Sequence, residues 1–105
     1  MTIKLTDLAV KQIVKSAEEG GMQHVPLRIA AKRQGDGSFE YAMGFDEQAD
    51  ADITREYDSL MVVVNPMSVD LLTGAILDYA ELEDGNWEFI FLNPNDPSYI
   101  PPNSV

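Results

Sequence analysis

The first apolar positions of the chain recur at helical spacing, at Val10, Ile13, Val14 and Ala17. Thr6 precedes this stretch and can cap a helix, and Asp7 would lie at its positive end. Gly20 and Gly21 follow it and favour a helix end. The pattern predicts an N-terminal helix between Thr6 and the glycine pair.

In the next segment, apolar residues alternate with polar or small ones, as is typical of β-strands. Residues 25–33 indicate a strand with Pro26 near its start, and the glycine-rich loop GDGS follows. After this loop, every second residue is large and apolar, at Phe39, Tyr41, Met43 and Phe45. We predict a β-hairpin with the loop at its tip.

The second half begins with a continuous apolar run. LMVVVN, residues 60–65, predicts a buried strand, and Pro66 is typical of a first helical turn. The short helix should reach Leu72 and end at Gly74. Two further strands should then flank a turn at Asp84, Gly85 and Asn86.

The elements together predict one α+β domain over residues 1–98, with mostly antiparallel strands, an N-terminal helix and a short second helix. The stretch NPNDPSYIPPNSV, residues 93–105, contains four of the six prolines and should be extended or disordered, with residues 99–105 as a flexible, proline-rich tail. The sequence shows no basic segment before an apolar run and no apolar run of about 18 residues, so we expect a cytoplasmic protein.

The amino-acid composition excludes several kinds of functional site. The 105 residues include no cysteine, which excludes disulfides, thiolate metal sites and cysteine catalysis. All seven Lys and Arg residues precede position 56, so residues 1–55 and 56–105 carry net charges of −2 and −9. Such a distribution disfavours nucleic-acid binding. It would attract a basic protein surface, or it could simply keep the chain soluble.

Several motifs have a functional and a structural interpretation. Asp46, Asp50 and Asp52 suggest a calcium loop, but no register supplies the required glycine and glutamate, so a solvated connection is favoured. The GDGS loop lacks the lysine and spacing of a phosphate-binding loop. His24 has no nucleophile motif beside it and is interpreted as a surface histidine. We therefore predict no enzyme.

The last strand pair offers two more candidates. Glu81 and Glu83 could serve as a pair of carboxylates for general acid–base catalysis, but we favour a role as solvated surface residues. Trp87, Phe89 and Phe91 alternate on one face, which could stack bases, but no Lys or Arg is near. We expect this face to belong to the core.

Several stretches resemble the A-type iron–sulfur carrier family, also called HesB/IscA, over roughly residues 3–98. They are LRIAAKRQG, FEYAMGFDE and VVVNPMSVDLLTGAILDYAELEDGNWEFIFLNPN. The more specific positions are Pro66, Ser68, Leu72, Gly74, Ile76, Asp78, Tyr79, Asn93, Pro94 and Asn95, with Leu77 inserted in the usual spacing. The resemblance implies a compact, β-rich domain with flanking helices.

Three cysteines bind iron or a cluster in that family, one in the glycine-rich loop and two near the C-terminus. By the resemblance, these positions fall at Asp36, Ile100 and Pro102 in this chain. Clusters are held chiefly by thiolates, and Ile100 and Pro102 carry no side-chain donor. Asp36 beside glycine is favoured as a turn residue over a weak ligand of a divalent ion.

The resemblance implies a cysteine-free homologue without cluster, cofactor or metal, similar to the DsrR-like proteins associated with bacterial sulfur oxidation. It would act as an accessory or regulatory module through a protein partner, with neither nucleic acid nor membrane. We expect the partner surface at Glu81, Glu83, Asp84 and Glu88. The alternative is a carrier of mononuclear iron or another hard cation in cluster assembly, using Asp36 and the carboxylates of residues 46–52.

Overall fold

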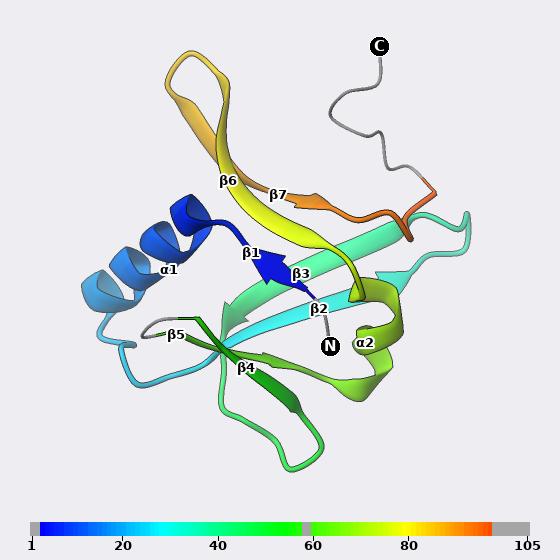
Figure 1. Cartoon of the computed structure of the whole chain (residues 1–105), viewed down its shortest axis with the longest axis horizontal. Coiled ribbons are helices and arrows are strands. Elements are labelled where there is room, and N and C mark those ends of the chain that lie inside the picture. Colours follow the sequence, from blue (N-terminus) through cyan, green and yellow to red (C-terminus); the bar gives the residue numbers. More distant parts are fainter. Residues whose placement is uncertain (1–2, 58–59, 98–105) are drawn as a thin grey trace.

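The computed structural model describes residues 3–57 and 60–97 (Figure 1). Its helices are α1 (Asp7–Gly20) and α2 (Pro66–Leu72). Its strands are β1 (Lys4–Leu5), β2 (Leu27–Arg33), β3 (Phe39–Phe45), β4 (Ile53–Tyr57), β5 (Leu60–Val64), β6 (Ile76–Glu83) and β7 (Asn86–Leu92). The α+β class, the two helices and the hairpins β2–β3 and β6–β7 are confirmed.

The caps of α1 explain its bounds. The Thr6 hydroxyl accepts a hydrogen bond from the Ala9 amide at 3.2 Å, which satisfies one of the free donors of the first turn. Gly21 ends the helix with a φ of 71°, in the left-handed region that glycine adopts without strain. The apolar side of the helix, including Val10 and Ile13, is buried.

The strands form two sheets with the orders β3-β2-β5-β4 and β1-β6-β7. Neighbours are antiparallel except for β2 with β5 and β1 with β6, which are parallel. The apolar sides of the sheets and α1 share one core. Its fully buried members include Ile3, Ile29, Val62, Leu72 and Leu77.

A serine hydroxyl continues the pairing of β2 where its parallel partner ends. The paired residues of β2 with β5 are only Leu27 and Arg28. Further along, the Ser68 hydroxyl of α2 accepts a hydrogen bond from the Ala31 amide and donates one to the Ala31 carbonyl, both at 3.2 Å. Both residues are buried, so Ser68 satisfies backbone groups that water does not reach.

Three expectations need correction. Residues 53–57 form β4 rather than a connection, because they pair with β5 along its whole length. The first hairpin strand begins at Leu27 rather than Val25, after Pro26, which has no amide hydrogen to donate. The residues after β7 begin with a turn, in which the Asp96 amide donates to the Asn93 carbonyl, rather than an extended tail. Among the described residues, no helix has the length and apolar character needed to cross a membrane.

Candidate functional site

The glycine-rich loop is a compact turn between β2 and β3. The Asp36 carboxylate accepts hydrogen bonds from the Ser38 amide at 2.9 Å and from the Ser38 hydroxyl at 2.6 Å. Gly37 has a φ of 89°, which a residue with a side chain rarely adopts. The Gly37 amide also bonds to the Gln34 carbonyl. Asp36, Gly37 and Ser38 therefore each have a role in forming the turn.

The hydrogen bonds around Asp36 also set its charge. The hydroxyl of Ser38, and then its amide, hold the pKa of the exposed Asp36 carboxyl below its usual range. Both donors engage Oδ1. Asp36 is thus an ionised turn residue at the tip of the hairpin, as its position beside glycine predicts.

The chain after β7 returns to the strand that follows this loop. The ring of Tyr41 on β3 stacks on Phe91 with centroids 4.4 Å apart and planes 5° apart. Its hydroxyl donates to Asp96 at 2.8 Å. Burial, and then the hydrogen bond to Asp96, raise the pKa of Tyr41 to about 12. The described chain therefore ends beside β3, while Ile100, Pro102 and the rest of the predicted tail lie outside the described residues.

The Asn-Pro-Asn motif holds this return in place. The side-chain amide of Asn93 donates to the Leu71 carbonyl at 2.6 Å, and the side-chain amide of Asn95 donates to the Thr73 carbonyl at 2.7 Å. Both acceptors lie at the C-terminal end of α2, where carbonyls lack partners within the helix. The motif therefore joins the end of β7 to α2 and has a structural role.

The suspected calcium loop is organised around an arginine. The Arg28 guanidinium contacts Asp46 at 2.7 Å and Asp52 at 2.6 Å, with a second bond to Asp52 at 2.9 Å. The Asp52 side chain is only 1% exposed. Arg28, and then the Ala49 amide, hold the pKa of Asp52 below its usual range. The sequence pattern indicated the aspartates, but it did not indicate their ion pairs with Arg28, because a pattern of neighbouring residues does not show tertiary contacts.

Three carboxylates of the cation hypothesis, those of Asp36, Asp46 and Asp52, already bind other residues of the chain. Within residues 3–57 and 60–97, no three His, Asp or Glu side chains are grouped closely enough to hold a metal ion. Asp36 lies in its own turn with Ser38, and Asp46 and Asp52 bind Arg28 instead. The structure thus does not bring the carboxylates of the cation hypothesis together in one group.

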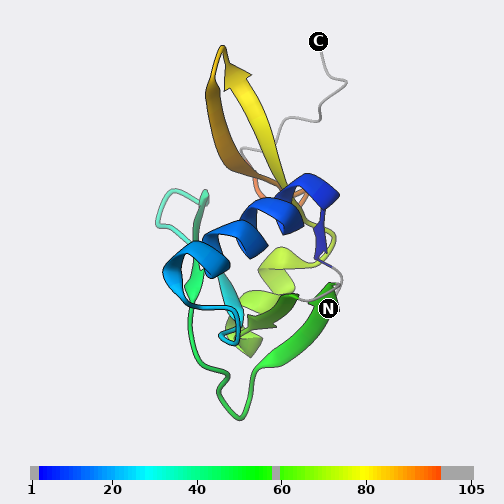
Figure 2. The same ribbon diagram turned by 90° about the vertical axis from the view of Figure 1, so that its left-hand side faces the viewer.

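The four acidic residues of the expected partner surface lie together at the tip of β6–β7. Figure 2 shows this hairpin extending beyond the rest of the domain. The set is exposed and consists of Glu81, Glu83, Asp84 and Glu88. The Glu81 carboxylate also accepts from the Gly85 amide at 3.0 Å, which supports the turn.

Two apolar side chains at this tip were not predicted as exposed. Trp87 is 44% exposed, which contradicts its placement in the core, although Phe89 and Phe91 do pack against the core. Trp87 lies near the exposed tip of the hairpin, and its ring stacks on that of Tyr79 with centroids 5.5 Å apart. Leu82, at a bulge opposite, is 51% exposed. The change of register that exposes Leu82 is not visible in the alternation of the sequence.

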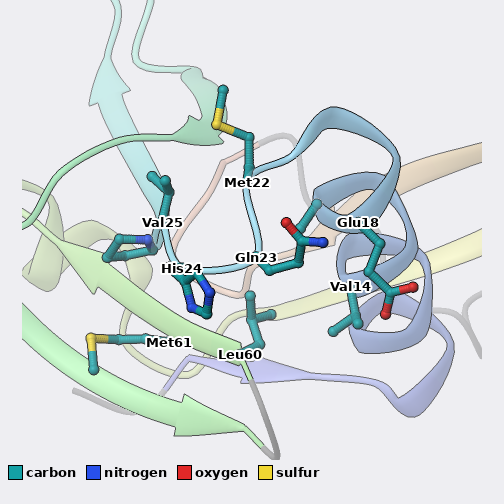
Figure 3. Close-up of a pocket in the computed structure, with 10 residues that line it drawn as sticks. Val14, Glu18, Met22, Gln23, His24, Val25, Leu60 and Met61 are labelled. Atoms are coloured by element: carbon teal, nitrogen blue, oxygen red, sulfur yellow. The ribbon is translucent and has the colours of Figure 1, made fainter.

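His24 lines a separate pocket of about 480 Å³ between the end of α1 and the start of β5. Most of its wall is apolar, with Val14, Leu60 and Met61 among the contributors. In Figure 3 the Met22 and Met61 sulfurs point away from the His24 ring rather than converging on it. His24 is exposed at the pocket, in agreement with its assignment as a surface histidine.

The amino-acid sequence of the chain is similar to those of several known proteins. No model of a protein family matches the chain. The iron–sulfur cluster insertion protein ErpA 2 of Methylococcus capsulatus is 38% identical over 95 residues, covering 90% of this chain and 72% of that protein. ErpA of Mannheimia succiniciproducens is 38% identical over 98 residues, covering 90% and 86%. A protein of Aquifex aeolicus is 40% identical over 93 residues, covering 88% and 79%.

Solved structures share the fold. The crystal structure of Escherichia coli SufA, involved in biosynthesis of iron–sulfur clusters, superimposes with a TM-score of 0.76 at 21% identity over 97% of this chain and 89% of that chain. IscA with its [2Fe-2S] cluster superimposes with a TM-score of 0.73 at 22% identity over 89% and 86%. At these identities, the match concerns the fold alone.

Proposed function

The chain belongs to the A-type iron–sulfur carrier family, also called HesB/IscA, and we propose that it is a member that has lost cluster binding and acts through protein contacts. The observation that carries this proposal is the absence of cysteine from all 105 residues. A cluster is the cargo of this family, and clusters are held chiefly by thiolates. In this proposal, the relatives named as cluster insertion proteins belong to the same family, but this chain does not bind the cluster that they insert.

The loop supports the same interpretation. Asp36, which matches the position of the loop cysteine, forms hydrogen bonds within its own turn. A single carboxylate is also a poor replacement for a thiolate, because iron in clusters favours soft sulfur ligands. Ile100 and Pro102, which match the other two positions, have no donor atom. Loss of all three ligands leaves the domain without a means of holding the cargo.

What remains is a domain with an exposed acidic hairpin. Glu81, Glu83, Asp84 and Glu88 are the partner surface in this proposal, and residues 56–105 carry no Lys or Arg to offset them. Opposite charge on a partner would steer the encounter and select against acidic surfaces. The function is accordingly that of an accessory or regulatory protein-interaction module, with no catalytic step.

The finer assignment follows the resemblance to DsrR-like proteins. A cysteine-free member of the family in the cytoplasm, acting in bacterial sulfur oxidation, fits the absence of thiolates together with the retained scaffold. The location of the gene beside genes of sulfur oxidation would support this branch. Location within a cluster-assembly operon would favour the alternative, a carrier of mononuclear iron or another hard cation through carboxylates.

Anaerobic reconstitution tests the loss of cargo. The purified chain is mixed with ferrous iron, sulfide and a reductant, then desalted, with ErpA 2 of Methylococcus capsulatus treated in parallel. We expect no visible cluster absorption and no retained sulfide from this chain. A stoichiometric absorption band that survives desalting would refute the proposal. Calorimetry with ferrous iron alone tests the alternative, which gains if a tight site is lost in Asp36→Ala.

A further inference from the structure

The outer edge of β7 is open. In the order β1-β6-β7, the strand has β6 on one side and, among the described residues, no strand on the other. Proteins commonly protect such edges with lysine, proline or a bulge. The segment Asn86–Leu92 contains neither lysine nor proline, and the irregularity of this hairpin lies in β6, between Glu81 and Glu83. Within residues 3–57 and 60–97, the outward amides and carbonyls of β7 thus have no strand to pair with, and we infer that another strand can use them.

Aromatic contacts hold this edge in a fixed shape. Along one face, Phe91 stacks on Tyr41 at 4.4 Å, and Tyr79 contacts both Phe89 at 4.7 Å and Trp87 at 5.5 Å. The row begins at the core and ends at the half-exposed Trp87. A partner strand would therefore meet an ordered edge with apolar area beside it, which lowers the entropy cost of binding.

The charge around the edge decides which partner fits. Glu88 lies on β7 itself, and Glu81, Glu83 and Asp84 lie across the hairpin and at its turn. A second copy of this chain would pair one acidic β7 with another and would bring no lysine or arginine from this hairpin, because residues 56–105 contain neither. An extended segment with lysine or arginine would neutralise the acidic side chains of this hairpin.

We propose that the β7 edge accepts an extended, basic segment of a partner protein as an added antiparallel or parallel strand. Main-chain hydrogen bonds would supply affinity, and alternate side chains of the segment would supply specificity. Trp87 and Glu88 are adjacent, so their side chains lie on opposite faces of β7. The basic residues of the segment would lie on the Glu88 face, and its apolar residues would cover Trp87 and Phe89. This inference rests on the proposed function and deepens it, because it names both the chemistry of the partner and the manner of its binding.

Two synthetic peptides test strand addition on the full chain. The first is a seven-residue peptide of alternating arginine and valine with blocked ends. The second has the same side chains, but every peptide nitrogen is methylated, so it keeps the charge and loses the donors of a strand. We expect the first to bind and to slow hydrogen exchange at alternate β7 amides, and the second to bind at least tenfold more weakly.

Matched variants separate the edge from general acidity. Glu88→Lys should weaken the first peptide several-fold, whereas Glu19→Lys, an equal charge change on exposed α1, should leave its affinity within twofold. Equal affinity for both peptides would overturn strand addition and leave the acidic contact of the proposed function standing. A dimer of the chain with protected β7 amides would also overturn the inference, since a second copy would then occupy the edge. Neither result depends on the outcome of cluster reconstitution.

Discussion

Tyr41 and Asp96 are 55 positions apart in the sequence, and the phenol of one donates a 2.8 Å hydrogen bond to the carboxylate of the other. This contact joins β3, which follows the glycine-rich loop, to the turn that follows β7. The end of the described chain is therefore held on the same side of the domain as the strand from that loop. Two predictions depend on this relationship.

The first concerns the ionisation of Tyr41. Its pKa is raised to about 12, chiefly by burial, so its folded form favours the neutral phenol. Above about pH 10, an unfolded chain would release this proton first, so stability should fall as pH rises from about 10 to 12. Ultraviolet difference titration should show a late phenolate step that disappears in Tyr41→Phe. The same late step persisting in Tyr41→Phe would assign it to another tyrosine.

The second concerns restored ligands. Asp36→Cys, Ile100→Cys and Pro102→Cys together should recover some cluster binding on anaerobic reconstitution, because a set of thiolates is then present on the family scaffold. Each single cysteine variant is a control and should hold no cluster. A folded triple variant that retains no more iron than the parent would mean that the tail does not reach the loop, or that the two terminal positions are wrongly matched.

The Ser68 hydroxyl leads to a stability prediction. Ser68→Ala should lower the free energy of unfolding by about 2 kcal/mol or more, because both backbone groups of buried Ala31 lose their partner. Urea unfolding measures this change. Ser16→Ala, at an exposed position of α1, is the control and should shift stability by less than about 0.5 kcal/mol. Equal effects of the two substitutions would contradict the role given to Ser68.

The pairing of Arg28 with Asp52 predicts an acid dependence. Arg28 lowers the pKa of Asp52, so the stability that this carboxylate contributes is present above about pH 4 and is lost as pH falls through the folded pKa. Asp52→Asn should lower the melting temperature by several degrees at pH 7 and flatten its fall between pH 5 and pH 2. Asp50→Asn, on the exposed part of the same connection, should resemble the parent in thermal scans.

The acidic hairpin predicts salt-dependent association. A variant in which lysine replaces all four acidic residues, Glu81, Glu83, Asp84 and Glu88, should bind a basic partner or the arginine–valine peptide at least tenfold more slowly. For the parent chain, the on-rate should fall as the Debye length shrinks from about 30 Å at 0.01 M salt to about 10 Å at 0.1 M. Stopped-flow kinetics measure both effects. On-rates indifferent to salt and to all four substitutions would mean that the acidic residues serve solubility alone.

Sequence reasoning succeeded where local chemistry dominates. The caps at Thr6 and Gly21, the glycine turn at Asp36 and the alternation in the hairpins each depend on residues close in the chain. It missed β4, because Ile53–Tyr57 is exposed and polar, and only its pairing with β5 makes it a strand. Parallel neighbours such as β2 and β5 were also not predicted, since register between distant segments is set by tertiary packing.

Some features of the candidate site could likewise be predicted from the sequence, and others could not. The exposure of the acidic tip agrees with the sequence, and its use by a partner stays a prediction. The Arg28 contacts could not be found, because Asp46 and Asp52 lie 18 and 24 residues from their arginine. Likewise, Tyr41 and Phe91 stack only because β3 and β7 meet in space.

Trp87 is the only tryptophan of the chain, and it lies half exposed at the end of the aromatic row rather than in the core. Its intrinsic fluorescence therefore reports on the β6–β7 hairpin, while circular dichroism reports on the whole domain. A ligand on this hairpin would change the emission without any change in the core. Emission could equally be lost before the core melts, so the two signals together distinguish fraying of the hairpin from global unfolding.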